Sequence, residues 1–140
     1  MSVVFALDPR LAADTLSVGT LPLCDLRLMN DSRFPWLVLV PRRVGRTEIG
    51  DLNGEEQTAL MAEIVAVSGL LRTVTACDKL NVGALGNIVR QLHVHIVARF
   101  ASDAAWPGPV WGKGVAERFD ASMLQRELER YGAVLERGVA

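Results

Sequence analysis

The segment that decides the fold is residues 91–97, which read Gln91-Leu92-His93-Val94-His95-Ile96-Val97. Polar and apolar residues alternate strictly along it, and this period of two is typical of a half-buried β-strand. Gln91, His93 and His95 would then share one face, with the apolar residues between them turned toward a core. Two histidines placed this way have Cβ atoms roughly 6.5–7 Å apart. The sequence contains only these two histidines, so the pair is either a coincidence or a functional site.

Length and composition limit the class of protein. The chain has 140 residues, half of them hydrophobic, and a formal net charge of −1. We therefore expect residues 1–140 to form a single domain. The near-zero charge argues against nucleic-acid binding through a general basic field and against a polybasic membrane anchor.

Targeting signals and cysteine pairs in a sequence indicate the cellular compartment of a protein. No apolar run approaches the roughly 18 residues of a membrane span, and the N-terminus lacks the features of a signal peptide. Cys24 and Cys77 are far apart in the sequence, which disfavours a disulfide framework or a structural zinc site. We expect a cytoplasmic protein that does not associate with membranes.

Hydrophobic periodicity and capping residues predict the order of the other elements. Val18 to Pro22 are expected to form a loop, and Asn53 and Asp120 to cap the two main helices. The expected elements are a short helix at 9–14, strands at 23–29 and 36–40 forming a hairpin, a helix from 54 to about 75, a strand at 78–82, the histidine strand, and a last helix after 120.

A loop with two glycines, Gly83 to Asn87, leads toward the histidines. Glycine allows a positive φ and lets a ligand approach the backbone without meeting a Cβ. Backbone amides exposed in this way can point at an anion. Many hairpin turns have a similar composition, so the loop gains meaning only from the two histidines beside it.

Several chemistries could use two histidines on one face. A metal site is one, but zinc usually takes three or four protein ligands, and no Asp or Glu follows the histidines until Asp103. The nucleophile turn of serine hydrolases and the glycine-lysine loop of nucleotide kinases are both absent from the sequence. What remains is histidine acting as nucleophile or general base beside a phosphate loop, or two histidines with no chemical role.

The longer segment Asn81–Val97, NVGALGNIVRQLHVHIV, resembles the signature of the histidine-triad (HIT) superfamily. In that signature, three histidines alternate with apolar residues after a loop containing asparagine and glycine. The order of the preceding strands, the Asn30 turn and the long helix is similar as well, so the resemblance covers about residues 20–100. A C-terminal loop and helix at 101–140 complete the domain.

The resemblance implies an α+β fold with about five antiparallel strands, one long central helix and a C-terminal helix, usually assembled as a homodimer. It implies that His93, the middle member of the triad, attacks the α-phosphorus of a nucleotide substrate and forms a nucleotidyl-imidazole intermediate that water hydrolyses. His95, the third member, would contact the phosphate, and we expect it to do so in its protonated form. Asn30 would contact the ribose, and the phosphate loop would be formed by Gly86, Asn87, Ile88 and Val89. Neither a metal nor another cofactor is formally required.

Two positions depart from the family pattern. Gln91 stands where the first triad histidine is expected, and Trp36 stands where many hydrolytic members carry a further histidine. The amide of Gln91 can donate and accept hydrogen bonds, so we place it with His93 and His95 in the catalytic group, but it cannot carry a proton charge at neutral pH.

Two functions are compatible with a site that retains the two histidines but has Gln91 and Trp36 at the altered positions. The first is a hydrolase or transferase that cleaves a nucleoside phosphate derivative, such as a dinucleoside polyphosphate or a nucleoside phosphoramidate. The second is a dimeric nucleotide-binding protein with little turnover.

Overall fold

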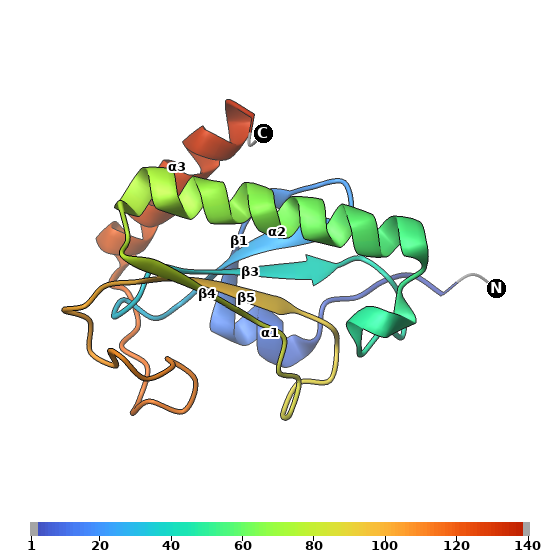
Figure 1. The fold of residues 1–140 in the computed structure, drawn as a ribbon, viewed down its shortest axis with the longest axis horizontal. Helices are drawn as coiled ribbons and strands as arrows, with labels where there is room; N and C mark the ends of the chain where they lie inside the picture. The colour runs from blue at the N-terminus through green and yellow to red at the C-terminus, as the bar shows by residue number, and fades with distance from the viewer. Residues whose placement is uncertain (1–2, 139–140) are drawn as a thin grey trace.

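The computed structural model describes residues 3–138 as a curved antiparallel sheet with helices packed on it (Figure 1). The sheet has five strands in the order β1-β2-β3-β5-β4. The expected α+β fold with a long helix and a C-terminal helix is confirmed. The bounds are α1 Pro9–Asp14, β1 Thr15–Thr20, β2 Cys24–Met29, β3 Trp36–Pro41, a 3₁₀ turn η1 Ile49–Asp51, α2 Gly54–Thr75, β4 Lys79–Gly83, β5 Val94–Arg99 and α3 Ala121–Glu136.

Capping side chains fix the ends of the helices where the sequence predicted them. At the start of α2, Asn53 accepts from the backbone amide of Glu56, and the Glu56 carboxylate accepts from the amide of Asn53. This reciprocal arrangement satisfies two amides that a helix start leaves without partners. Asp120 caps α3 by accepting from the amide of Met123, and Asp8 caps α1 by accepting from the amide of Arg10.

By length and composition alone, helix α2 is long and apolar enough to cross a membrane. The expectation that no segment meets this criterion is therefore wrong. Core helices of globular domains meet the same criteria. In this structure Leu60, Val67 and Leu71 of α2 are buried in the main hydrophobic core, together with residues of the sheet. Packing therefore explains the apolar residues on one face of α2, while Met61 and Val65 on the other face are exposed.

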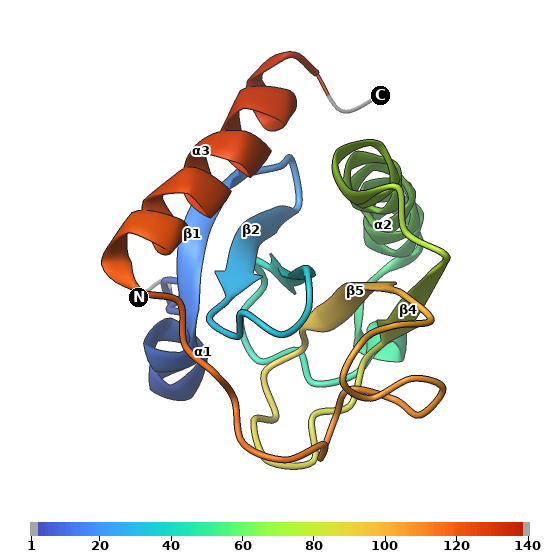
Figure 2. The same cartoon turned by 90° about the vertical axis from the view of Figure 1, so that its left-hand side faces the viewer.

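The two central strands are buried on both faces, and each face belongs to a different core. On β5, Val94 and Ile96 belong to the core beneath α2 and α3. Trp36, Val38 and Val97 belong to a second core on the other face of the sheet. Figure 2 shows α1 and the long connections on the side of the sheet away from α2. Because side chains alternate along β5, His95 also lies on this second face.

Two expectations about strands are wrong. The histidine strand begins only at Val94, because the segment before it lies outside the sheet ladder and the amide of Leu92 bonds to the carbonyl of Arg46 instead. The region expected to be a loop contains the second half of β1, which pairs with β2 and shifts register at Gly19. A Cβ on Gly19 would lie 2.6 Å from a Leu135 methyl carbon of α3, so glycine there permits close helix packing and does not indicate a turn.

Candidate functional site

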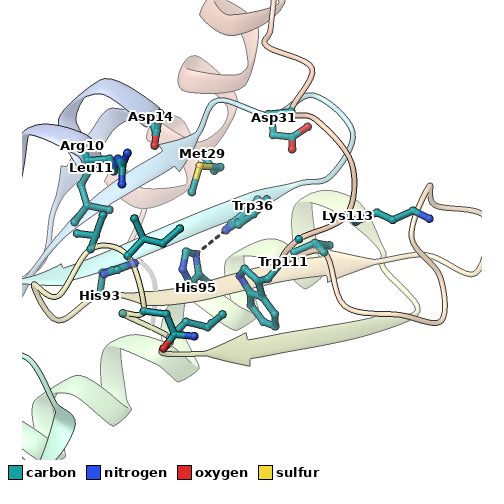
Figure 3. Close-up of a pocket in the computed structure, with 18 of the residues that line it drawn as sticks. Arg10, Leu11, Asp14, Met29, Asp31, Trp36, His93, His95, Trp111 and Lys113 are labelled. Carbon is teal, nitrogen blue, oxygen red and sulfur yellow. Dashed lines mark hydrogen bonds between the residues drawn. The ribbon is translucent and has the colours of Figure 1, made fainter.

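A pocket of about 690 Å³ opens on the second face of the sheet. It lies between α1, the loop after β4, and the segment that follows β5, with His93 and His95 in its wall (Figure 3). Both histidines are 6 % exposed, so each ring presents only a small surface to the pocket. Segments that are far apart in the sequence therefore converge on the two imidazoles.

The two histidine rings lie close together in an edge-to-face arrangement. Their centroids are 4.9 Å apart and their planes are inclined by 78°. The residue between them, Val94, is buried in the opposite core. Both imidazoles line the pocket, as expected for two side chains on one face.

The orientation of His93 is set by a backbone group. Its Nδ1 lies 2.7 Å from the carbonyl oxygen of Gln91. Because a carbonyl can only accept a hydrogen bond, Nδ1 must carry the proton. In the neutral ring, the lone pair is then on Nε2, which is the nitrogen available for nucleophilic attack.

His95 has a different environment. The indole N–H of Trp36 donates to its Nδ1 at 3.0 Å, and the Trp36 and Trp111 rings flank it with centroids at 5.5 Å and 5.6 Å. Burial, with a further contribution from His93, lowers the pKa of His95 to about 3. In the ligand-free chain His95 is therefore neutral, in contrast to the protonated form expected from the sequence, because a charged ring would lose its hydration here.

The side chain of Gln91 is directed away from the pocket. Its Oε1 accepts a hydrogen bond from the amide of Asp8 at 2.8 Å, and its Nε2 donates to the carbonyl of Ala6 at 2.8 Å. The expectation that Gln91 shares a face with the histidines is wrong, because these two hydrogen bonds turn its side chain toward the N-terminal segment and Gln91 does not line the pocket. It fastens instead the segment that precedes α1, the helix that supplies Arg10 to the pocket wall.

The loop after β4 is where the sequence placed it. Gly86, Asn87, Ile88 and Val89 all line the pocket. Gly86 has a φ of 74°, a conformation that glycine adopts without the penalty of a Cβ. The loop therefore lies within reach of a ligand bound at His93.

Asn30 has a structural role that the sequence did not suggest. Its Oδ1 accepts from the amide of Phe119 at 3.0 Å, which attaches the segment leading into α3. The neighbouring Asp31 lines the pocket instead and forms an ion pair with Arg33 at 2.8 Å. Hydrogen bonds from Arg33 lower the pKa of Asp31 despite its burial.

Charged residues of the pocket wall were also missed by sequence reasoning. Arg10 and Asp14 come from α1, and Lys113 comes from the segment after β5. Asp14 is paired with Arg118 at 3.3 Å. Isolated charges in a short helix and in a loop carry no periodic signal, and only the folded chain brings them to one cavity.

A buried ion pair fixes the segment that carries Trp111. Arg99 is 1 % exposed and donates to the Asp103 carboxylate, to Oδ1 of Asn81 and to the carbonyl of Gly108. The Arg99 guanidinium holds the pKa of Asp103 well below its usual range. This network orders the connection after β5, which forms the wall opposite α1.

Comparison with known proteins identifies the family. The model of the HIT domain matches residues 10–102, a range that contains both histidines and the loop before them. The chain belongs to the HIT family. Among residues 3–138 of this HIT protein, no group of three or more His, Cys, Asp or Glu side chains is placed to hold a metal ion.

Solved structures extend the likeness to nearly the whole HIT protein. A histidine triad protein from Bradyrhizobium japonicum is 45% identical, with a TM-score of 0.91, and the match covers 99% of this chain and 100% of that one. One from Marinobacter aquaeolei is 43% identical, with a TM-score of 0.93 and coverage of 96% and 98%. The diadenosine triphosphate hydrolase of Plasmodium falciparum shares the fold, with a TM-score of 0.68 at 12% identity and coverage of 100% and 89%. No match was found among curated protein sequences.

Proposed function

We propose that this HIT protein binds a nucleotide in the 690 Å³ pocket and cleaves a nucleoside phosphate derivative through a covalent intermediate on His93. The observation that carries this proposal is the 2.7 Å contact between Nδ1 of His93 and the carbonyl of Gln91. It leaves Nε2 as the free nucleophilic nitrogen, in a pocket wall shared with a glycine loop.

The proposed reaction has two displacements at phosphorus. Nε2 of His93 attacks the α-phosphorus, and the bond from phosphorus to the leaving group breaks, so that the leaving group departs with the electron pair. Water then attacks the same phosphorus, the phosphorus–nitrogen bond breaks, and His93 is regenerated as a nucleoside monophosphate is released. The Gln91 carbonyl accepts from Nδ1–H and stabilises the positive charge that the ring gains in the first displacement.

This role of Gln91 accounts for the altered triad. The group that orients His93 is a backbone carbonyl, and every residue type supplies one. Glutamine in place of histidine therefore leaves the nucleophile oriented. The side chain is released for a different purpose, the attachment of Ala6 and Asp8.

Cationic side chains of the wall supply the charge that a neutral His95 does not. Arg10 and Lys113 both line the pocket, and neither is in a salt bridge within residues 3–138. Guanidinium and ammonium groups bind phosphate oxygens through charge-assisted hydrogen bonds. We assign to them the phosphates beyond the one attacked, which favours a dinucleoside polyphosphate as substrate. The shared fold of the Plasmodium hydrolase is consistent with this class.

We further propose that the protein is a homodimer, as the family resemblance implies, and that it works in the cytoplasm, as its two scattered cysteines suggest. The outer side of α2 presents exposed apolar residues, including Met61 and Val65, which line a shallow groove with Ile49. Exposed apolar patches of this kind are typical of association surfaces. Sedimentation at several concentrations should give twice the chain mass, and Val65→Glu should shift the distribution toward the monomer.

The experiment that tests the catalytic proposal compares turnover with binding. Wild type, His93→Ala and His93→Asn are incubated with diadenosine polyphosphates and with adenosine phosphoramidate, and AMP release is measured. Turnover by wild type and by neither variant supports the enzyme. AMP binding without turnover of any of these substrates would favour instead a nucleotide-binding protein with little catalytic activity.

A further inference from the structure

The contact between Trp36 and His95 determines which nitrogen of His95 carries a proton. The indole Nε1 of Trp36 lies 3.0 Å from Nδ1 of His95. An indole N–H can only donate, so Nδ1 of His95 must offer its lone pair. The proton of the neutral ring is therefore on Nε2, the opposite arrangement to that of His93.

The surroundings hold this pair in place. Trp36 is 7 % exposed and lies on β3, which pairs directly with β5. Phe34 packs edge-on against Trp36, with centroids 6.5 Å apart. The ionisable side chains around His95 are His93 on the same segment and, from the other elements that line the pocket, Arg10, Asp14, Asp31, Arg33 and Lys113.

We propose that Trp36 is a positioning residue that holds His95 as the neutral Nε2–H tautomer, so that His95 donates a hydrogen bond to the substrate and does not serve as an acid or base. The assignment of the tautomer stands on the geometry alone. Its use toward a phosphate rests on the proposed function. Protonation at Nδ1 would require the Trp36 hydrogen bond to break.

This assignment has a consequence for the leaving group. A neutral Nε2–H can stabilise negative charge on a departing oxygen but cannot protonate it without becoming an imidazolate. A leaving group that departs as a stable anion, such as a nucleoside polyphosphate, needs no proton from the protein. An alkylamine leaving group must take a proton as the phosphorus–nitrogen bond breaks. The site therefore favours phosphoric anhydrides over alkyl phosphoramidates.

The test uses the fact that the sequence has only two histidines. Nitrogen-15 NMR of the imidazoles in the substrate-free protein should show two rings with opposite tautomers, and His93→Asn assigns them by removing one. We expect His95 to remain the Nε2–H tautomer from pH 8 down to about pH 5. A Nδ1–H tautomer, or exchange between the two forms at pH 7, would overturn the proposal.

Two variants separate the hydrogen bond from the aromatic packing. Trp36→Phe keeps a ring but removes the donor, and we expect a mixture of tautomers and a rise of about one unit in the pKa of His95. Trp111→Phe is the matched control: its ring also flanks His95, but its N–H has no partner, so the His95 tautomer should not change. If Trp36→Phe does not fold, the hydrogen bond is tested in wild type by the scalar coupling between Trp36 Nε1 and His95 Nδ1. Absence of this coupling refutes the hydrogen bond.

Substrate preference gives a second readout. Wild type should cleave a diadenosine polyphosphate faster than an alkyl phosphoramidate of AMP by roughly 100-fold or more, the contribution expected of a general acid. Equal rates would show that the site protonates its leaving group, and would overturn the role assigned to His95. If the tautomers are as expected but neither substrate is cleaved, the catalytic proposal fails while the assignment of Trp36 stands.

Discussion

Gln91 joins the segment before the histidines to the segment before α1, because its side-chain oxygen accepts a hydrogen bond from the backbone amide of Asp8 at 2.8 Å. The two residues are separated by most of the domain in sequence. Nε2 of the Gln91 side chain donates a second hydrogen bond, to the carbonyl of Ala6. The short segment before α1 is therefore held at two points. Residue 91 therefore holds the N-terminal wall of the pocket in this chain.

Gln91→Ala should loosen this wall and leave the nucleophile oriented. We expect faster amide hydrogen exchange at Ala6, Asp8 and α1, unchanged exchange in α2, and a several-fold rise in KM. The value of kcat should change little, since alanine retains the carbonyl that orients His93. The control is Gln125→Ala, whose side chain donates a hydrogen bond to Glu129 on the exposed side of α3. A loss of kcat as large as that of His93→Ala would contradict this division of roles.

Arg10→Ala and Lys113→Ala should each weaken binding of a polyphosphate substrate. Removing one charge-assisted hydrogen bond is expected to raise KM or Kd roughly tenfold, and to reduce the dependence of binding on salt. Arg72→Ala is the control, because Arg72 lies at the end of α2 and does not line the pocket. Equal effects of all three substitutions would indicate a general charge effect and no specific phosphate contacts.

Burial of His95 predicts a loss of stability in acid. Its pKa falls from the ordinary 6.5 to about 3 in the folded chain. Between these values the unfolded chain binds a proton that the folded chain does not, so the free energy of unfolding decreases as the pH falls below 6.5. At pH 5 this decrease is about 2 kcal/mol. Urea titrations at pH 7.5 and 5 should show it in wild type, and a smaller decrease in His95→Gln. The same pH dependence in both proteins would exclude His95 as its source.

The ion pair of Arg99 and Asp103 should contribute strongly to stability because both side chains are almost fully buried. Asp103→Ala leaves the guanidinium without its carboxylate, and we expect a loss of about 3–5 kcal/mol in the free energy of unfolding. Glu127→Ala removes the carboxylate of an exposed pair with Arg130 and should cost less than about 1 kcal/mol. Calorimetry or urea titration compares the two. A small effect of Asp103→Ala would mean that the connection after β5 is held by its other contacts.

The sequence predicted those parts of the fold that depend on local chemistry. The capping residues Asn53 and Asp120 and the apolar stripes behind them identified α2 and α3, because caps and helical periodicity act over a few residues. The same holds for β3, whose apolar run is buried on both sides. Strand β1 was missed because Gly19 resembles a turn residue until the approach of Leu135 is known.

The site was predictable only where its residues are adjacent in sequence. The histidine pair and the loop at Gly86 lie within one segment, and the period of two places both rings on one face. The side chain of Gln91 was misplaced because its hydrogen bonds to Ala6 and Asp8 join segments that are far apart in the sequence. Asp31 carries no periodic signal in the sequence, and Arg10 and Lys113 reach the pocket only through long-range packing, for which a single sequence offers no signal.

The central claim is that His93 becomes covalently bonded to phosphorus during turnover. The most direct measurement starts from a reaction of the protein with a diadenosine polyphosphate that is quenched at alkaline pH during turnover. The protein is then digested with trypsin, and the modified peptide is sequenced by mass spectrometry. Cleavage after Arg90 and Arg99 releases residues 91–99 with both histidines, so fragment ions must distinguish the two rings. We expect a nucleotidyl group on His93 in wild type and none in His93→Asn. Turnover without an adduct on either ring, or an adduct on His95, would contradict the central claim.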